Sequence, residues 1–381
     1  MNEEKLYITT SSNITVYDRI LEFTDKKYDI LYNEISQDFE ISFKNKKKWT
    51  SLNLNSLLIE LTKVEIKTRM STLEVFIKSD EIKTHNPFKS YFKQLNKWDG
   101  IDYISKLASY VPTKEPILFK YHLKKWMVRT VKCALKNKYF NKQALILVHD
   151  EQNTGKTTFC RFLCPIKLTD YIAENIGYGK DSNIQLTRNF LINLDELDKI
   201  EKKEINGYKS MFSKIQVNLR LPYDRRNTNL PRTCSFVGST NHSNFLEDET
   251  GSVRWLCFEL SDIINFNYSK DIDIDDVWAQ AYHLANDPNF NSELTIQDIK
   301  QNEERNDKYK VLSVEEELIY ENYTKSDDLI DFKTTATIVQ EISNIYPKAN
   351  NISIGKAIRS LGFERIKNKK TQRWGYLIRK A

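Results

Sequence analysis

The first part of the chain predicts a small region of mixed helices and strands. The candidate strands are Tyr28–Tyr32 and Phe39–Phe43, and a candidate helix lies near Leu54–Val64. Proline and glycine, which interrupt regular elements, recur between about Asp80 and Pro116. We therefore expect an N-terminal α+β and connecting region over residues 1–112.

The middle of the chain has the pattern of a parallel α/β sheet. An apolar stripe along Ile117–Lys138 predicts an amphipathic helix, and from Ala144 short apolar runs alternate with helical stretches. The expected strands are Ala144–Val148, Phe190–Leu194, Thr233–Ser239 and Trp255–Leu260. A further helix is predicted at Val277–Ala285, and the α/β domain is expected over residues 113–300.

The C-terminal part of the chain changes to helices followed by two short strands. The charged segment Glu303–Lys310 is predicted as a linker. The expected elements are helices at Thr335–Ile342 and Ile354–Leu361, strands at Gly362–Glu364 and Arg373–Ile378, and a basic turn at Lys367–Lys370. This order resembles a winged-helix module, which we expect over residues 313–381.

Composition excludes several classes of protein. Hydrophobic residues make up 40% of the chain, enough for a sizeable core, and no apolar run approaches the ~20 residues that a membrane-spanning helix needs. The N-terminus lacks the pattern of a signal peptide, so a cytoplasmic protein with no membrane partner is expected. The five cysteines form no C-x-x-C pair, which favours structural thiols over zinc sites or disulfides.

Positive charge is concentrated at the C-terminal end. The formal net charge is +6, but from Ile352 to Ala381 nine Lys or Arg residues accompany a single acid, Glu364. That stretch therefore carries +8, and the remainder of the chain is close to −2. Such asymmetry is typical of a segment that binds a polyanion.

The strongest chemical signal follows the Ala144–Val148 strand. A loop there runs into Gly155-Lys156-Thr157 at the start of a predicted helix, the context that a Walker A motif requires. Lys156 would bind the β- and γ-phosphate oxygens of ATP, and the Thr157 hydroxyl would bind Mg²⁺. The expected nucleotide contacts are Asn153, Thr154, Gly155, Lys156, Thr157 and Thr158. Asp150 occupies the position of the usual first glycine, which predicts weaker nucleotide binding.

Two later strands end in polar residues that suit the same site. Asp195 and Glu196 follow Phe190–Leu194, where Asp195 would help to hold Mg²⁺ and Glu196 would act as general base on the attacking water. Alternatively, this acidic pair caps the next helix. Asn241 follows the Thr233 strand and suits a side chain that senses the γ-phosphate and orients water, or else it simply turns a loop.

Arg254 directly precedes the Trp255–Leu260 strand. An arginine in this place can reach the γ-phosphate of a neighbouring subunit and stabilise charge in the transition state. The alternative is an ordinary surface residue.

Taken together, these motifs resemble the virulence-associated E (VapE-like) proteins of phages and mobile elements, which are related to superfamily 3 helicases. The resemblance spans roughly Asn86 to Ala285. It rests on Asn86-Pro87-Phe88, Trp98-Asp99-Gly100, Gly155-Lys156-Thr157, Asp195-Glu196-Leu197, Leu221-Pro222-Tyr223, Gly238-Ser239-Thr240-Asn241, Phe245-Leu246-Glu247-Asp248 and Trp278-Ala279-Gln280-Ala281. It implies a AAA+-like P-loop core, ATP hydrolysis coupled to movement on DNA, and a homo-oligomer such as a hexameric ring. Val253 stands where the family tends to have a second arginine, a departure that predicts slow hydrolysis.

Two segments are candidates for contact with single-stranded or forked DNA. Ile215–Arg226 alternates like a hairpin and contains Arg220, Tyr223, Arg225 and Arg226, which suit phosphate contacts and base stacking. Alternatively, Arg225 and Arg226 reach ATP across a subunit interface. In the C-terminal module the candidates are Lys356, Arg359, Lys367, Lys369 and Lys370. Such a module can also dock a protein.

Two functions fit these residues better than any others. One is an ATP-dependent DNA helicase, translocase or replication-initiation ATPase of a phage or mobile element. The other is a nucleotide-gated DNA-binding switch that hydrolyses ATP weakly, in phage interference or replication control. A structural adaptor without nucleotide binding would leave Lys156, Thr157, Asp195 and Glu196 unexplained. The first hundred residues lack a convincing set of acidic metal ligands for priming, so any primase would be a separate protein.

Overall fold

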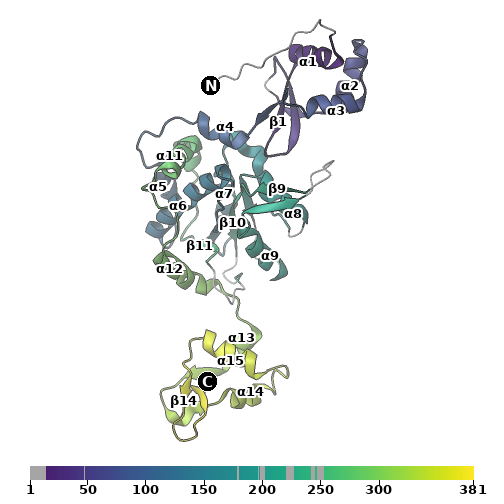
Figure 1. The fold of residues 1–381 in the computed structure, drawn as a ribbon. Coiled ribbons are helices and arrows are strands. Elements are labelled where there is room, and N and C mark those ends of the chain that lie inside the picture. The colour runs from purple at the N-terminus through teal and green to yellow at the C-terminus, as the bar shows by residue number, and fades with distance from the viewer. Residues whose placement is uncertain are drawn as a thin grey trace. The chain divides into compact units, whose positions relative to one another are not determined.

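The computed structural model describes residues 14–46, 48–177, 180–195, 197, 202–219, 227–241, 245, 246 and 253–381 (Figure 1). Within these residues the chain divides into two compact units. One comprises residues 14–241 and 253–305, and the other comprises Phe245, Leu246 and residues 306–381. Among the described helices, none combines the length and apolar character needed to cross a lipid bilayer.

The N-terminal region has its own sheet and its own small core. Its helices are α1 (Val16–Lys27), α2 (Leu54–Lys63) and α3 (Met70–Ile77), and its strands are β1 (Tyr28–Asn33), β2 (Asp38–Phe43), β3 (Thr50–Ser51) and β4 (Lys83–His85). The strand order is β3-β2-β1-β4, and the core residues include Ile20, Leu61 and Phe76. The strands predicted at Tyr28 and Phe39 and the helix at Leu54 are confirmed.

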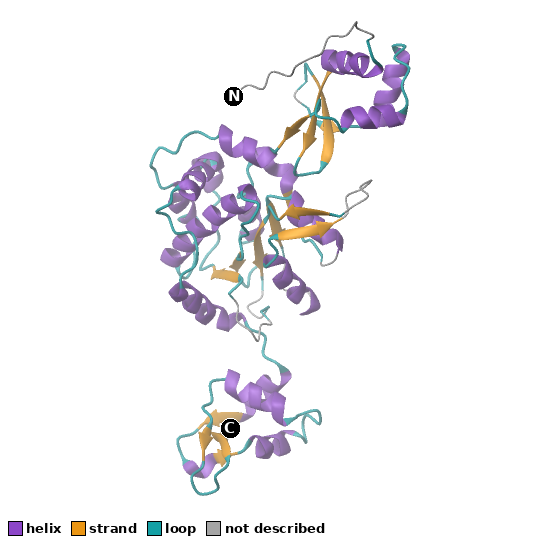
Figure 2. Ribbon diagram, viewed as in Figure 1, coloured by secondary structure: helices purple, strands orange, loops and turns teal. Residues whose placement is uncertain are grey.

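A five-stranded parallel sheet forms the centre of the larger unit, so the mixed α/β class is confirmed (Figure 2). Its strands are β5 (Ala144–Val148), β6 (Ile172–Glu174), β7 (Leu191–Leu194), β10 (Ser235–Thr240) and β11 (Trp255–Glu259), in the order β11-β5-β10-β7-β6. Every neighbouring pair is parallel. Residues of β5, β7 and β10 are buried throughout, which explains the unbroken apolar run of β5. The four predicted strands are confirmed, and the short β6 was not predicted.

Helices cover this sheet on both sides (Figure 1). They are α4 (Pro87–Gln94), α5 (Tyr103–Ala108), α6 (Pro116–Leu135), α7 (Lys156–Phe162), the 3₁₀ helix η1 (Ile166–Tyr171), α8 (Lys180–Arg188), α9 (Lys202–Phe212), α10 (Tyr268–Asp271), α11 (Ile274–Asn286) and α12 (Ile296–Asn306). Figure 1 shows α5, α6, α11 and α12 on one side of the strands and α8 and α9 on the other. The rings of Phe92, Phe190 and Trp278 pack together within 5.0–6.2 Å and tie α4 and α11 to the sheet.

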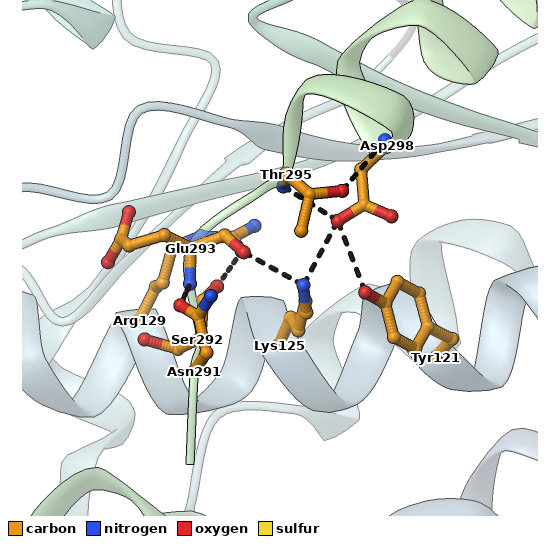
Figure 3. Close-up of polar contacts among 8 residues, drawn as sticks. All are labelled: Tyr121, Lys125, Arg129, Asn291, Ser292, Glu293, Thr295 and Asp298. Atoms are coloured by element: carbon orange, nitrogen blue, oxygen red, sulfur yellow. Dashed lines mark hydrogen bonds and ion pairs between the residues drawn. The ribbon is translucent and has the colours of Figure 1, made fainter. Parts of the chain in front are cut away.

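A buried polar network joins α6 to the start of α12 (Figure 3). The Lys125 ammonium donates to the Asp298 carboxylate at 3.0 Å and to the Glu293 carbonyl at 2.8 Å, and the Tyr121 hydroxyl donates to the same carboxylate at 3.1 Å. Arg129 donates to the Ser292 carbonyl at 2.6 Å. Lys125 and Asp298 are only 5% and 7% exposed, so each charge depends on its partners for solvation.

Replacing Lys125 with methionine is expected to lower the free energy of unfolding by about 3–5 kcal/mol, because it leaves the Asp298 carboxylate buried without its cation. Urea unfolding of the full chain measures this loss. Lys26→Met is the matched control, since its pair with Glu22 is exposed on both sides and should contribute little to stability. Equal effects of the two substitutions would contradict the role assigned to the buried pair.

The C-terminal unit is built from three helices and a small sheet. Its elements are α13 (Val314–Asn322), α14 (Thr335–Ile342), α15 (Asn351–Ser360), η4 (Leu329–Asp331), β12 (Tyr323–Lys325), β13 (Phe332–Lys333), β14 (Ile366–Lys367) and β15 (Trp374–Lys380). Strand β15 pairs with β12, β13 and β14, all antiparallel. The two predicted helices are confirmed. A core that includes Ile338, Ile354 and Ile358 lies between them and the sheet.

Two expectations for this part of the chain need correction. Glu303–Lys310 contains the junction of the two units, between Arg305 and Asn306, but it is not irregular, because α12 runs to Asn306 and the 3₁₀ helix η3 (Asp307–Tyr309) buries Tyr309. Many charges there indicated a linker, but they occupy a helix that also has a buried side. No strand forms at Gly362–Glu364, because Gly362 adopts a positive φ of 76° and Phe363 turns into the core. The pairing strand is β14, which contains Lys367.

Candidate nucleotide-binding site

The loop between β5 and α7 is sharply bent. Asn153 and Gly155 have positive φ angles of 60° and 89°. Glycine adopts this conformation without strain, and asparagine tolerates it better than most residues. The backbone therefore turns just before Lys156, and α7 begins at that residue. Asn153 and Thr158 are exposed, whereas Thr154 is buried.

Lys156 lies inside this loop. Its side chain is 5% exposed, and its ammonium donates to the carbonyls of His149 at 3.1 Å and Glu151 at 2.9 Å and to the Thr154 hydroxyl at 3.0 Å. These three acceptors carry no formal charge. Asp150 is exposed at the start of the loop. The loop thus folds around a cation.

Thr157, on the first turn of α7, lies beside Asp195 at the end of β7. The Thr157 hydroxyl donates to the Asp195 carboxylate at 2.7 Å, and the Ser239 hydroxyl of β10 donates to the same oxygen at 2.5 Å. The two hydroxyl oxygens are 3.3 Å apart. The main chain of Asp195 is held as well, because its N–H donates to the Asn175 side chain at 2.7 Å. Strand order explains the cluster, because β10 lies between β5 and β7.

Ser239 and Asn175 were not among the predicted site residues. Ser239 is a polar residue next to the last in β10, two positions before the predicted Asn241, so its residue type offered a signal. Asn175 follows β6, the strand that was missed, and has a φ of 45°. Without that strand, its place beside β7 could not be inferred.

Three predicted residues of this site remain to be placed: Glu196, Asn241 and Arg254. Glu196 lies outside the described residues. Asn241 follows β10 directly, and because Thr240 pairs with Val148, Asn241 lies level with the first residue of the β5–α7 loop. Arg254 is at the opposite edge of the sheet, since Trp255 pairs with Ala144 at the start of β5. A strand rises about 3.3 Å per residue, so the length of β5 separates Arg254 from the loop of its own chain.

The predicted hairpin is present and begins where expected, but it extends further along the chain than predicted. Strands β8 (Gln216–Leu219) and β9 (Thr228–Pro231) form an antiparallel pair. The second strand therefore begins after Arg226. The predicted nucleic-acid residues of this segment, Arg220, Tyr223, Arg225 and Arg226, lie outside the described residues.

The predicted basic residues of the C-terminal unit are all exposed. Lys356 and Arg359 lie on α15, whose opposite face contributes Ile354, Ala357 and Ile358 to the core. Lys367 is on β14, and Lys369 and Lys370 are in the turn that follows.

An exposed tryptophan beside these basic residues was not predicted. Trp374 pairs with Lys367 across the hairpin and is 52% exposed. The Arg365 guanidinium lies over its ring, 5.3 Å from the centroid. An aromatic residue within a basic stretch is a signal that the sequence already carried.

The cysteines take no part in this site. All five are buried, free thiols. Burial, followed by the nearby charge of Asp195, raises the pKa of Cys160 on α7, so this residue stays protonated and unreactive at neutral pH.

Fold and site together define an α/β protein with a parallel sheet that gathers a lysine, a threonine, a serine and an aspartate at the carboxyl ends of its strands. The model of the virulence-associated protein E-like domain matches residues 92–311, which is more than half of the chain. The chain therefore belongs to the VapE-like family. No functionally curated protein has a matching sequence.

Solved structures with a similar fold include an apo structure of the NrS-1 C-terminal region (305–718). It has 13% sequence identity and a TM-score of 0.54, and the match covers 97% of this chain and 99% of that one. Two A-form apo structures of the NrS-1 C-terminal region have 12% and 14% identity and TM-scores of 0.50, with 95% of this chain and 98% of those chains covered. At such identities the likeness concerns the fold alone.

Proposed function

We propose that this chain is an ATP-dependent DNA helicase, translocase or replication-initiation ATPase of a phage or mobile genetic element. The observation that carries the proposal is the convergence of Lys156, Thr157, Asp195 and Ser239 at the carboxyl edge of the central sheet. A cation enclosed by a bent loop, next to hydroxyl groups and a carboxylate, suits a magnesium–triphosphate. Membership of the VapE-like family supports the same function.

The residues of the loop fit the phosphates of ATP. The partners of Lys156 include three uncharged oxygens, and charged phosphate oxygens would bind its ammonium more strongly than these do. Gly155 and Asn153 bend the loop so that backbone N–H groups can face an anion. This loop is accordingly proposed as a Walker A motif in a AAA+-like core.

Thr157 and Asp195 are the proposed magnesium ligands. Within the described residues, no three His, Cys, Asp or Glu side chains are grouped to hold a metal ion. That arrangement is compatible with Mg²⁺, which typically takes one or two protein ligands and completes its shell with phosphate oxygens and water. When bound, the ion would neutralise charge that develops on the transferred phosphoryl group.

Hydrolysis also needs groups that activate and orient the attacking water and a group that stabilises the negative charge of the transition state. Glu196 is proposed as general base and Asn241 as the side chain that orients the water. Arg254 lies at the other edge of its own sheet, so it can serve only the nucleotide of a neighbouring subunit. The proposal therefore includes a homo-oligomer, with a hexameric ring as one arrangement.

DNA is the proposed partner of two surfaces. One is the β8–β9 hairpin with its arginines. The other is the C-terminal unit, proposed as a winged helix with α15 as its recognition helix and the β14–β15 turn as its wing. There Trp374 can stack on an unpaired base while the surrounding lysines bind phosphates. A primase, where one is needed, would be a separate protein.

One observation favours a second candidate, a nucleotide-gated DNA-binding switch with weak hydrolysis. Asp150 places a carboxylate at the start of the proposed phosphate-binding loop. A negative charge there opposes a triphosphate. The absence of a second arginine at Val253 points the same way.

ATP hydrolysis measured with and without single-stranded DNA tests the proposed function. The motor predicts turnover that DNA stimulates, together with displacement of a strand from a forked duplex. The switch predicts ATP-dependent DNA binding with little turnover and no displacement. Both candidates would be contradicted if the chain binds ATP but DNA does not change ATP hydrolysis and ATP does not change DNA binding.

Replacing Lys367, Lys369 and Lys370 together with alanine is expected to weaken single-stranded DNA binding and to flatten its salt dependence. Each lost phosphate contact should reduce the slope of log K against log salt by about 0.7. Fluorescence anisotropy with a labelled oligonucleotide at several salt concentrations measures the slope. Alanine at the exposed Lys63, Lys78 and Lys83 of the N-terminal region is the matched control. An unchanged slope would remove this unit from the DNA-binding surface.

A further inference from the structure

Main-chain hydrogen bonds hold the segment that follows β11 in place, and one of them joins it to the β5–α7 loop. Ile264 N–H donates to the Thr154 carbonyl at 3.0 Å, and Asn265 N–H donates to the Tyr110 carbonyl at 3.0 Å. The first bond fixes the segment against the loop, one residue before Gly155, and the second joins it to the stretch that follows α5. The position of the next side chain, Phe266, is therefore set by the backbone.

The Phe266 ring lies directly against Gly155. A methyl group placed on Gly155 would come within 2.8 Å of the ring and 3.3 Å of Ile264, so only glycine fits beneath them. The positive φ of Gly155 imposes the same requirement independently. The contact is thus close and specific, and it involves the residue that precedes Lys156.

Much of the ring nevertheless faces solvent. Phe266 is 46% exposed and Ile263 is 55% exposed, whereas the next aromatic residue, Tyr268, is buried against Phe159 and Phe162 of α7. Support for α7 thus comes from Tyr268. Phe266 also contacts Tyr268, with 6.4 Å between the ring centroids, but this contact and the one with Gly155 leave Phe266 half exposed. An exposed apolar surface next to a polar site is typical of a ligand contact.

We propose that Phe266 supplies the surface on which the base of the bound nucleotide rests. This inference depends on the proposed function, because it takes the β5–α7 loop to hold the phosphates. A nucleotide held there by its phosphates must place its sugar and base beside the loop. Every nucleobase has a π-face, and an aromatic ring stacks on it with little dependence on the base. The site would therefore require a nucleoside triphosphate while discriminating only modestly among bases.

Isothermal titration calorimetry on the full chain tests this inference with two probes, Mg-ATP and inorganic Mg-tripolyphosphate, which lacks a base. Phe266→Ala is expected to weaken ATP binding by about 5- to 150-fold, the range that loss of one base–aromatic stack produces. Tripolyphosphate affinity should stay unchanged, which also shows that the loop is intact. Phe266→Tyr keeps an aromatic face and should bind ATP as the wild type does.

Each other outcome overturns the inference in a recognisable way. Equal weakening of both probes would show that the ring only supports the loop around Gly155. No change with either probe would show that the base lies elsewhere. If the wild-type chain binds tripolyphosphate but gains nothing from the base, the inference fails and the phosphate site stands. If it binds neither probe, the proposed function fails as well.

Discussion

Lys156→Ala is expected to reduce ATP hydrolysis by at least about 10²–10³-fold, the loss typical of removing one preorganised charge or donor from a transition state. Lys156 is the only lysine or arginine among residues 149–156. Its ammonium is therefore the one fixed positive charge that this segment places at the proposed phosphate position. Steady-state phosphate release with excess ATP measures the effect.

The control for this variant is Lys142→Ala, an exposed lysine just before β5 that should leave turnover unchanged. Thermal unfolding of both variants separates loss of chemistry from loss of fold. The carbonyls freed in Lys156→Ala lie in a loop with exposed neighbours, so water can take up their hydrogen bonds. Turnover that persists in Lys156→Ala would remove this loop from the catalytic site.

Asp195→Asn is expected to produce the second large effect, a loss of about 10²–10³-fold in hydrolysis. The amide oxygen can still accept the hydrogen bonds that Thr157 and Ser239 donate, so the local structure should persist. What disappears is the negative charge that draws Mg²⁺ into the site. Turnover measured against Mg²⁺ concentration should therefore show both a lower maximum and a higher requirement for the ion.

Ser239→Ala is the graded control for Asp195→Asn. It removes one hydroxyl donor from the carboxylate but keeps the charge, so its effect on turnover should be much smaller. If Asp195→Asn hydrolyses ATP with the wild-type dependence on Mg²⁺, then Asp195 has another role, such as capping the helix that follows.

The central sheet was predictable because its strands are buried on both faces. Burial forces residues such as those of Ala144–Val148 to be apolar without interruption, and such runs are visible in sequence. The three-residue β6 is too short to leave a comparable pattern. Strand order is likewise invisible in sequence, because it depends on which crossover each helix makes.

The same distinction applies to the site: residues that are close in sequence were predictable, and residues that only the strand order brings together were not. Lys156 and Thr157 are recognisable because loop and helix are contiguous in the chain. That Ser239 shares the Asp195 carboxylate follows only from the place of β10 between β5 and β7. The contact of Phe266 with Gly155 joins residues far apart in sequence and had no local signature.

The most direct test of this account is the affinity of the purified full chain for a non-hydrolysable ATP analogue, measured by calorimetry with and without Mg²⁺. If Lys156, Thr157 and Asp195 meet on one magnesium–triphosphate, each chain should bind one nucleotide, and Mg²⁺ should strengthen that binding in the wild type but not in Asp195→Asn. Absence of binding, or binding indifferent to Mg²⁺, would contradict the claim that this edge of the sheet is a nucleotide site.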